Sequence, residues 1–161
     1  MLSRQKITTY LWFDDNAEEA MCFYVSIFKN SKILDVVRYG DAGPGPKGTV
    51  MCGTFQLEGQ QFIALNGGPH FKFTEAISLF VSCENQEEVD DLWKKLTAGG
   101  GSPSQCGWLK DKFGLSWQIV PTALLEMMAD EDAAKSKRVM QAMLRMIKID
   151  INGLKQAYDQ P

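Results

Sequence analysis

The chain is poor in histidine, a residue that catalytic and metal sites use often. Its 161 residues include one histidine, His70, so neither a histidine pair nor a histidine-based triad exists. That histidine follows a proline in a predicted loop, where a surface or turn position is expected. The four cysteines show no C-x-x-C spacing, which argues against a zinc knuckle or redox motif and favours reduced, mostly buried thiols in a cytosolic protein.

Long apolar runs and a strong charge excess are missing as well. Arg4, Lys6 and Asp14 interrupt the apolar start of the chain, which argues against a signal peptide. No stretch approaches the roughly 20 apolar residues that span a bilayer. The formal net charge is −3, so no basic field suggests nucleic acid or an anionic membrane. We therefore expect a cytoplasmic protein with neither kind of partner.

What the chain does contain is a weak internal repeat of residues 7–28 and 77–97. A shift of 69 positions carries the run Asn16-Ala17-Glu18-Glu19-Ala20 onto Asn85-Gln86-Glu87-Glu88-Val89. A repeat of this length indicates two copies of one supersecondary unit, each too small to bury its own core. A shared core, and any cleft, would then lie between related elements.

Hydrophobic periodicity predicts the same elements in both copies. The first copy reads strand, helix and three strands, at residues 7–13, 16–29, 32–39, 49–57 and 61–65. The second copy reads strand, helix and two strands, at residues 76–83, 86–97, 107–110 and 115–120, with a poorly marked middle strand near 102–106. Each copy is therefore expected to be a βαβββ unit.

The last part of the chain is expected to be a helical tail. A short helix is predicted near 124–128 and a long one at 133–158, with Asp132 as a possible N-cap. One face of the long helix is apolar and comprises Val139, Met143, Ile147, Ile151, Leu154 and Tyr158. We expect this face to help build a homodimer interface, since two-fold pairing is the commonest solution, or else to pack on the chain's own sheet.

The predicted fold class is accordingly α+β, with two βαβββ repeats that form curved sheets in an open barrel. The modules are expected at 1–75 and 76–121, and the helical tail at 122–161, all within one fused domain. Strand alternation would place one set of side chains inside the resulting cup.

The repeat carries a family resemblance. The pattern N-x-E-E-A-x-x-F-Y at 16–24, the runs at 10–13 and 106–118, and the tail resemble the vicinal oxygen chelate superfamily. That group includes glyoxalase I, bleomycin and fosfomycin resistance proteins and extradiol dioxygenases. More narrowly, the chain resembles the PhnB-like branch, which is often labelled 3-demethylubiquinone-9 3-methyltransferase. The resemblance covers nearly the whole chain.

In metal-using members, the resemblance implies His or Gln on the first strand of each half and Glu on the last strands. Thr9, Ser78 and Gln118 stand at these positions here. Hydroxyl and amide groups are poor ligands for transition metals, so we expect no metal. No Gly-rich turn joins a strand to a helix, so the label's methyl transfer lacks the site of a nucleotide-like cofactor, and we expect no cofactor.

The candidate ligand-binding residues are those that alternation places in the cup: Thr9, Leu11, Phe13, Asn66, Ser78, Phe80 and Gln118. An apolar cup with a few hydroxyls and amides suits a small hydrophobic or aromatic ligand. We favour a metal-free binding protein. An enzyme on the same fold, either a methyltransferase or a metal-dependent lyase or dioxygenase, stays open. So does a structural dimer whose cup is filled by its own side chains.

Overall fold

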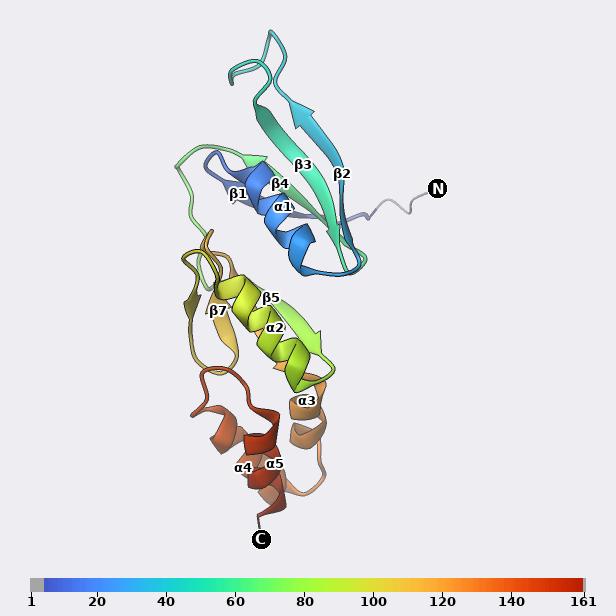
Figure 1. Cartoon of the computed structure of the whole chain (residues 1–161), viewed down its shortest axis with the longest axis vertical. Helices are drawn as coiled ribbons and strands as arrows, with labels where there is room; N and C mark the ends of the chain where they lie inside the picture. The colour runs from blue at the N-terminus through green and yellow to red at the C-terminus, as the bar shows by residue number, and fades with distance from the viewer. Residues whose placement is uncertain (1–4, 161) are drawn as a thin grey trace. The chain divides into compact units, whose positions relative to one another are not determined.

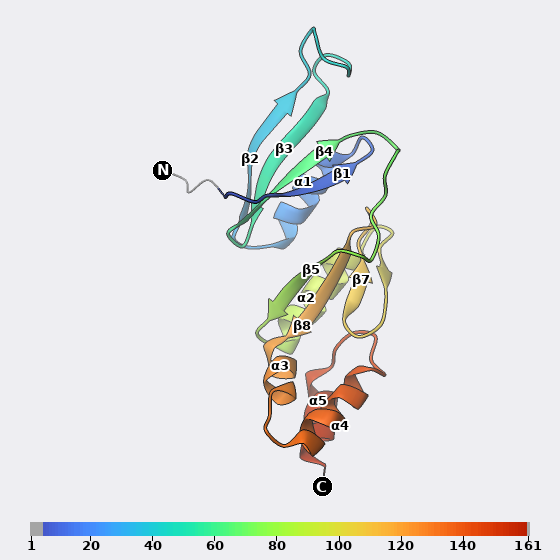
Figure 2. The same cartoon turned by 180° about the vertical axis from the view of Figure 1, so that it is seen from behind.

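The computed structural model describes residues 5–160 of the chain, and Figures 1 and 2 show it from opposite sides. The chain divides into two compact units between Lys72 and Phe73. Each unit contains one four-stranded sheet and at least one helix, and the second also carries the C-terminal helices. The predicted α+β class with two βαβββ repeats and a helical tail is confirmed.

The first unit has one helix between its first two strands. Its elements are β1 (Thr9–Phe13), α1 (Ala17–Ile27), β2 (Ser31–Arg38), β3 (Val50–Leu57) and β4 (Gln60–Asn66). The strand order is β1-β4-β3-β2, with β1 parallel to β4 and the other pairs antiparallel. Glu58 and Gly59 both have positive φ in the tight turn between β3 and β4, as a two-residue type I′ hairpin turn requires.

The second unit repeats this order. Its elements are β5 (Ser78–Cys83), α2 (Gln86–Thr97), β6 (Ser102–Pro103), β7 (Trp108–Lys110) and β8 (Ser116–Pro121). The strand order is β5-β8-β7-β6, with β5 parallel to β8, so β1 and β5 hold equivalent places. Strand β6 has only two residues, whereas β2 has eight. This short strand lies where the sequence marked the middle strand poorly.

The core of the first unit lies between α1 and one face of the sheet. Tyr24 of α1 stacks on Phe55 of β3 with ring centroids 6.0 Å apart, and Phe55 stacks on Phe62 of β4 at 5.4 Å. A Cβ at Gly53 would lie 2.4 Å from the Cε atom of Met21, so glycine lets the helix approach the sheet closely. Figure 1 shows α1 in front of this sheet, and Figure 2 shows the sheet in front of α1.

The tail consists of three helices, which corrects one prediction. They are α3 (Thr122–Met128), α4 (Ala133–Met143) and α5 (Ile151–Asp159), so the single helix expected at 133–158 is wrong. Between α4 and α5 the carbonyls of Met146 and Ile147 accept hydrogen bonds from the backbone N–H groups of Cys106 and Gly107, both at 2.8 Å. These two carbonyls bond to the backbone just before β7 instead of to a later turn of a helix, so the chain bends there.

Side-chain caps mark where the two later helices begin. The Asp132 carboxylate accepts hydrogen bonds from the N–H groups of Ala134 and Lys135, which confirms the predicted cap of α4. Asp150 does the same for α5, because its carboxylate accepts from the N–H groups of Asn152 and Gly153. A second capping residue inside the expected long helix is the local signal for the break.

The tail packs on its own unit. The end of β8 and the three tail helices share an apolar cluster of Val120, Leu124, Val139, Ile149 and Leu154. The Gln86 side chain of α2 donates to the Ile149 carbonyl at 3.0 Å and accepts from the Ile151 N–H at 2.8 Å. Lys148 also forms a 2.6 Å ion pair with Asp90 of α2. A homodimer with the tail at its interface stays a prediction.

Candidate functional site

Strand pairing places three of the predicted site residues under α1. Thr9 pairs with Phe62, Leu11 with Ala64 and Phe13 with Asn66, and residues paired across strands share a face of the sheet. Phe62 and Ala64 belong to the face that α1 covers, because Gly53, which pairs with Ala64, lies against Met21. Leu11 and Phe13 are each only 3% exposed. Thr9, Leu11 and Phe13 therefore lie on the helix-covered face of the first sheet.

Asn66 lies on the same face and holds three elements together. Its Oδ1 atom accepts a hydrogen bond from the Ala17 N–H at 2.8 Å, at the start of α1. Its Nδ2 atom donates to the carbonyl of Val50, at the start of β3, at 3.1 Å. Both ends of the amide are thus engaged with the backbone, and Asn66 caps α1 from a neighbouring strand.

In the second unit, the predicted residues lie on the face of the sheet that is opposite α2. Ser78 and Phe80 of β5 face this way together with Gln118 of β8, since Phe80 and Gln118 are paired. The Gln118 Nε2 atom donates to the Ser78 Oγ atom at 2.9 Å. The alternate side chains are those of Leu109, Trp117 and Ile119, which are buried on the side of α2. We call the face of each sheet that is opposite α1 or α2 its open face.

One residue in a connection explains why the two halves differ. Three residues join β1 to α1, whereas two residues join β5 to α2. The helices therefore match at a shift of 69, which carries Ala17 onto Gln86, but the strand faces match at 70, which carries Thr8 onto Ser78. A slip of one residue in a strand moves every side chain to the other face. Thr8 and Tyr10, and not Thr9 and Leu11, are the counterparts of Ser78 and Phe80.

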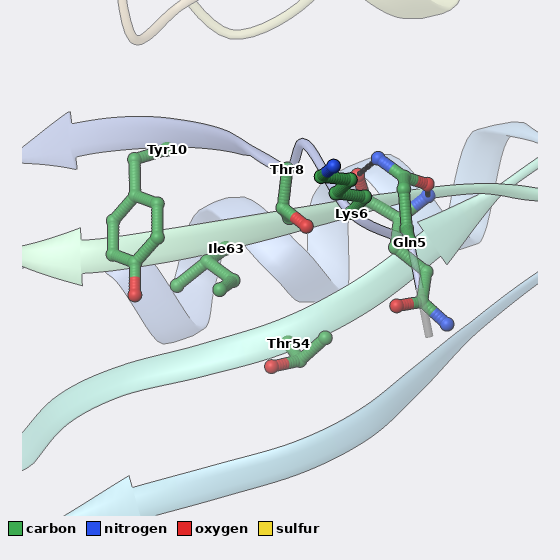
Figure 3. Close-up of a pocket in the computed structure, with 7 residues that line it drawn as sticks. Gln5, Lys6, Thr8, Tyr10, Thr54 and Ile63 are labelled. Atoms are coloured by element: carbon green, nitrogen blue, oxygen red, sulfur yellow. Dashed lines mark hydrogen bonds between the residues drawn. The ribbon is translucent and has the colours of Figure 1, made fainter. Parts of the chain in front are cut away.

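The open face of the first sheet carries a cavity of about 430 Å³ (Figure 3). Its lining comes from β1, the residues before β1, β3 and β4, and comprises Gln5, Lys6, Thr8, Tyr10, Thr54, Gln61 and Ile63. Tyr10, Ile63 and Thr54 form one row, because Tyr10 pairs with Ile63 and Ile63 with Thr54. The Tyr10 side chain is 61% exposed, so its ring offers apolar surface to an occupant.

Gln5 closes one end of this cavity. Its Nε2 atom donates to the Gln61 carbonyl at 3.3 Å, and its Oε1 atom accepts from the Gln61 N–H at 3.2 Å. The side-chain amide thus pairs with β4 as a further strand residue would. Figure 3 shows Gln5 and Lys6 together, away from Tyr10. The cavity therefore has a polar end and an aromatic end.

The residues at these positions do not fit a transition-metal site. None of the described residues that line the cavity is a His, Cys, Asp or Glu. Within residues 5–160, no three such side chains lie close enough together to hold a metal ion. If Thr8 instead of Thr9 stands at the metal-ligand position of the first strand, the ligand chemistry is the same, since both side chains are hydroxyls. We derive no metal-assisted step from these residues.

The strand-to-helix connections do not fit a nucleotide-like cofactor. The connection before α1 is Asp14-Asp15-Asn16, and the one before α2 is Glu84-Asn85. Neither contains the glycines that let a cofactor approach the backbone, and both carry carboxylates.

No helix within residues 5–160 is long and apolar enough to cross a membrane.

The cysteines offer no activated nucleophile in the core. All four are free, but only Cys83 is buried, so the expectation of mostly buried thiols is wrong. Cys22 lies on the exposed side of α1, and Cys52 and Cys106 are half-buried. Burial raises the pKa of the Cys83 thiol to about 12, which keeps it protonated at neutral pH.

Comparison with solved structures places this architecture. Two βαβββ units with this strand order form a fold that the chain shares with a fosfomycin resistance protein, described below. The chain belongs to the family described as 3-demethylubiquinone-9 3-methyltransferase, whose model matches residues 5–120. The helices α3, α4 and α5 lie beyond the matched residues.

Individual relatives agree with this assignment. A Bacillus cereus structure that carries the same family description, and is also called PhnB protein, is 43% identical, with a TM-score of 0.67 over 73% of this chain and 99% of its own. A Pseudomonas aeruginosa protein is 21% identical, with a TM-score of 0.60 over 73% and 97%. FosX, a fosfomycin resistance protein from Listeria monocytogenes, is 16% identical, with a TM-score of 0.50 over 73% and 92%; these last two likenesses concern the fold alone. No match was found among curated proteins.

Proposed function

We propose that the chain is a cytosolic, metal-free binding protein for a small hydrophobic or aromatic molecule. The observation that carries this proposal is the cavity of about 430 Å³ on the open face of the first sheet. Its volume is that of a small-molecule site, and its lining combines an aromatic ring, an aliphatic side chain and a few polar groups.

In this proposal the predicted residues take two roles. Ser78, Phe80 and Gln118 contact ligand on the open face of the second sheet, where Phe80 is exposed and the other two carry hydrogen-bonding groups. Thr9, Leu11, Phe13 and Asn66 act from the helix-covered face. They hold β1 and β4 against α1 and so fix the positions of Tyr10 and Ile63, which lie on the other face of the same strands.

The second candidate is an enzyme on the same fold. The family description favours transfer of a methyl group to a demethylubiquinone-type phenol. Affinity for S-adenosylmethionine is the property that separates it from the binding protein, and the Gly-free connections before α1 and α2 weigh against that affinity. Metal-dependent activities of the superfamily are weaker candidates because of the donor set.

Native mass spectrometry of the protein, purified without added ligand, tests the proposal. We expect a bound organic molecule that is released on denaturation and less than 0.1 transition-metal ion per chain, roughly the background of a site without good ligands. Tyr10→Ala and Ile63→Ala should lower the bound fraction. Ile7→Ala is the matched control, because Ile7 is 85% exposed and does not line the cavity. One metal ion per chain, or tight binding of S-adenosylmethionine in place of an organic ligand, would contradict the proposal.

A further inference from the structure

The charge of the cavity is one-sided. Among the described residues that line it, Lys6 is the only charged one, and none is a carboxylate. Among residues 5–160, no ion pair is recorded for the Lys6 ammonium. A lysine that has no partner beside a cavity attracts an anionic group without first having to break an existing pair.

One hydroxyl group of the lining lies near this lysine in the chain. Thr8 follows Lys6 by two residues and lines the same cavity, and its hydroxyl can donate a hydrogen bond to an anionic oxygen. Thr54 lines the cavity in the row of Tyr10 and Ile63. The Gln5 amide is already paired with the backbone of Gln61, so it shapes this end of the cavity instead of competing for the ligand.

The opposite end is apolar. Figure 3 shows Tyr10 and Ile63 next to each other, with Lys6 and Gln5 further along the strands. An aromatic or aliphatic body can lie on the Tyr10 ring while a group at its other end reaches the ammonium. The lining therefore sets both the class of ligand and its direction.

We infer that this cavity takes a small organic anion, in which an anionic oxygen group adjoins an apolar, ring-sized body. This inference rests on the proposed function and names the ligand class of the same site. Lys6 binds the anionic oxygens, Thr8 donates a hydrogen bond to them, and Tyr10 and Ile63 contact the body of the ligand.

A pair of probes with the same shape and different charge tests the inference. Binding of 2-naphthoate and of the neutral 2-naphthamide to the full chain is measured by calorimetry, and chemical shifts of residues 5–10 and 61–63 locate the site. We expect the anion to bind about tenfold more tightly, the size of a charge-assisted hydrogen bond at a partly exposed position. Raising the salt concentration should weaken the naphthoate alone.

Two lysine variants decide whether Lys6 is responsible. Lys6→Gln removes the charge and keeps a donor, so the two probes should then bind within about twofold of each other. Lys29→Gln is the matched control: Lys29 is also an exposed lysine of the first unit, but it does not line the cavity. It should leave the preference unchanged.

The outcomes separate this inference from the proposed function. Equal binding of both probes to the natural chain, or an anion preference that survives Lys6→Gln, overturns the inference while a co-purified neutral ligand still supports a binding protein. Failure of both probes at millimolar concentration also overturns it. If no organic molecule co-purifies either, the proposed function falls with it.

Discussion

At the scale of single residues, two buried polar side chains of the second unit stand in contrast. The Asp111 carboxylate accepts hydrogen bonds from the N–H groups of Phe113 and Leu115 at 2.9 and 3.1 Å, and from the Trp117 indole at 2.9 Å. The Ser116 hydroxyl is also buried but has no hydrogen-bond partner among the described residues. Asp111 thus organises its turn, whereas Ser116 costs stability.

Replacing Ser116 by alanine should stabilise the protein. The residue is 1% exposed, so the substitution removes an unsatisfied hydroxyl and leaves little empty space. We expect the free energy of unfolding to rise by about 1 kcal/mol, measured by urea denaturation. Ser82→Ala, on the exposed part of the same sheet face, should change it by less than about 0.5 kcal/mol. A loss of stability in Ser116→Ala would mean that the hydroxyl finds a partner in solution.

The site residues show what a single sequence can reveal at this scale. Strand alternation predicted one face for Ser78, Phe80 and Gln118, and all three lie on the open face of the second sheet; their contact with a ligand stays a prediction. The first-half residues were one position off. Small residues carry the missing signal: Gly53 and Ala64 are paired and make room for α1, so their alternates in β3 and β4 must face away from the helix.

At the scale of elements, periodicity predicted helices and strands well but not their joints. The expected helix at 86–97 coincides with α2, and every expected strand has a counterpart. The length of the connection before α1 was invisible, because the repeat was aligned on the helix pattern and the strands were carried along. The prediction of one long helix in the tail was wrong for another reason. Ile147 and Ile151 continue the helical spacing across the break, although Ile147 lies in the turn between α4 and α5.

The contact between α2 and the tail gives a prediction at this scale. The Gln86 amide is the partner of the Ile149 carbonyl and the Ile151 N–H, and both groups lose that partner in Gln86→Ala. We expect a loss of about 2 kcal/mol in the free energy of unfolding, and faster hydrogen exchange at residues 144–151. Gln141→Ala, at an exposed position of α4, is the control. Unchanged hydrogen exchange at Ile151 would show that the two hydrogen bonds of Gln86 contribute nothing to the stability of the tail.

The packing of the tail, both within itself and on α2, should also depend on pH. The Tyr158 hydroxyl donates to the Asp130 carboxylate, which lowers the pKa of Asp130 and raises the pKa of Tyr158. The hydrogen bond and ion pair that Lys148 makes with Asp90 lower the pKa of that carboxyl as well. Lowered carboxyl pKa values give stability that is complete above the usual range near 4 and is lost as the pH falls through the lowered values.

The tyrosine acts at the other end of the scale. Its raised pKa gives stability that is complete below about pH 10 and is lost as the pH rises through the raised value. Thermal midpoints measured by circular dichroism from pH 2 to 12 should therefore fall at both extremes. Tyr158→Phe should remove part of the alkaline fall, whereas Tyr39→Phe in the first unit should not. An alkaline limb identical in Tyr158→Phe and the natural chain would contradict this assignment.

At the scale of the whole molecule, the open question is what covers the remaining apolar surface. Leu144 and Ile147 are both 57% exposed in the turn between α4 and α5, even though the tail already packs on its own unit. The edge strands β1 and β5 each have a single neighbour in their sheets. Exposed strand edges and apolar side chains are commonly covered by a second copy of the chain.

We therefore predict a symmetric homodimer in which the turn between α4 and α5 contributes to the interface. Removing the whole tail is a poor test, because Val120 of β8 belongs to the tail cluster and would lose its cover. Leu144→Glu combined with Ile147→Glu changes only exposed side chains and should convert the dimer to a folded monomer in light scattering at micromolar concentration. Lys155→Glu, on the exposed side of α5, should leave it dimeric. A natural chain that scatters as a monomer would reject the dimer, and a double variant that stays dimeric would place the interface elsewhere, with the strand edges as the next candidates.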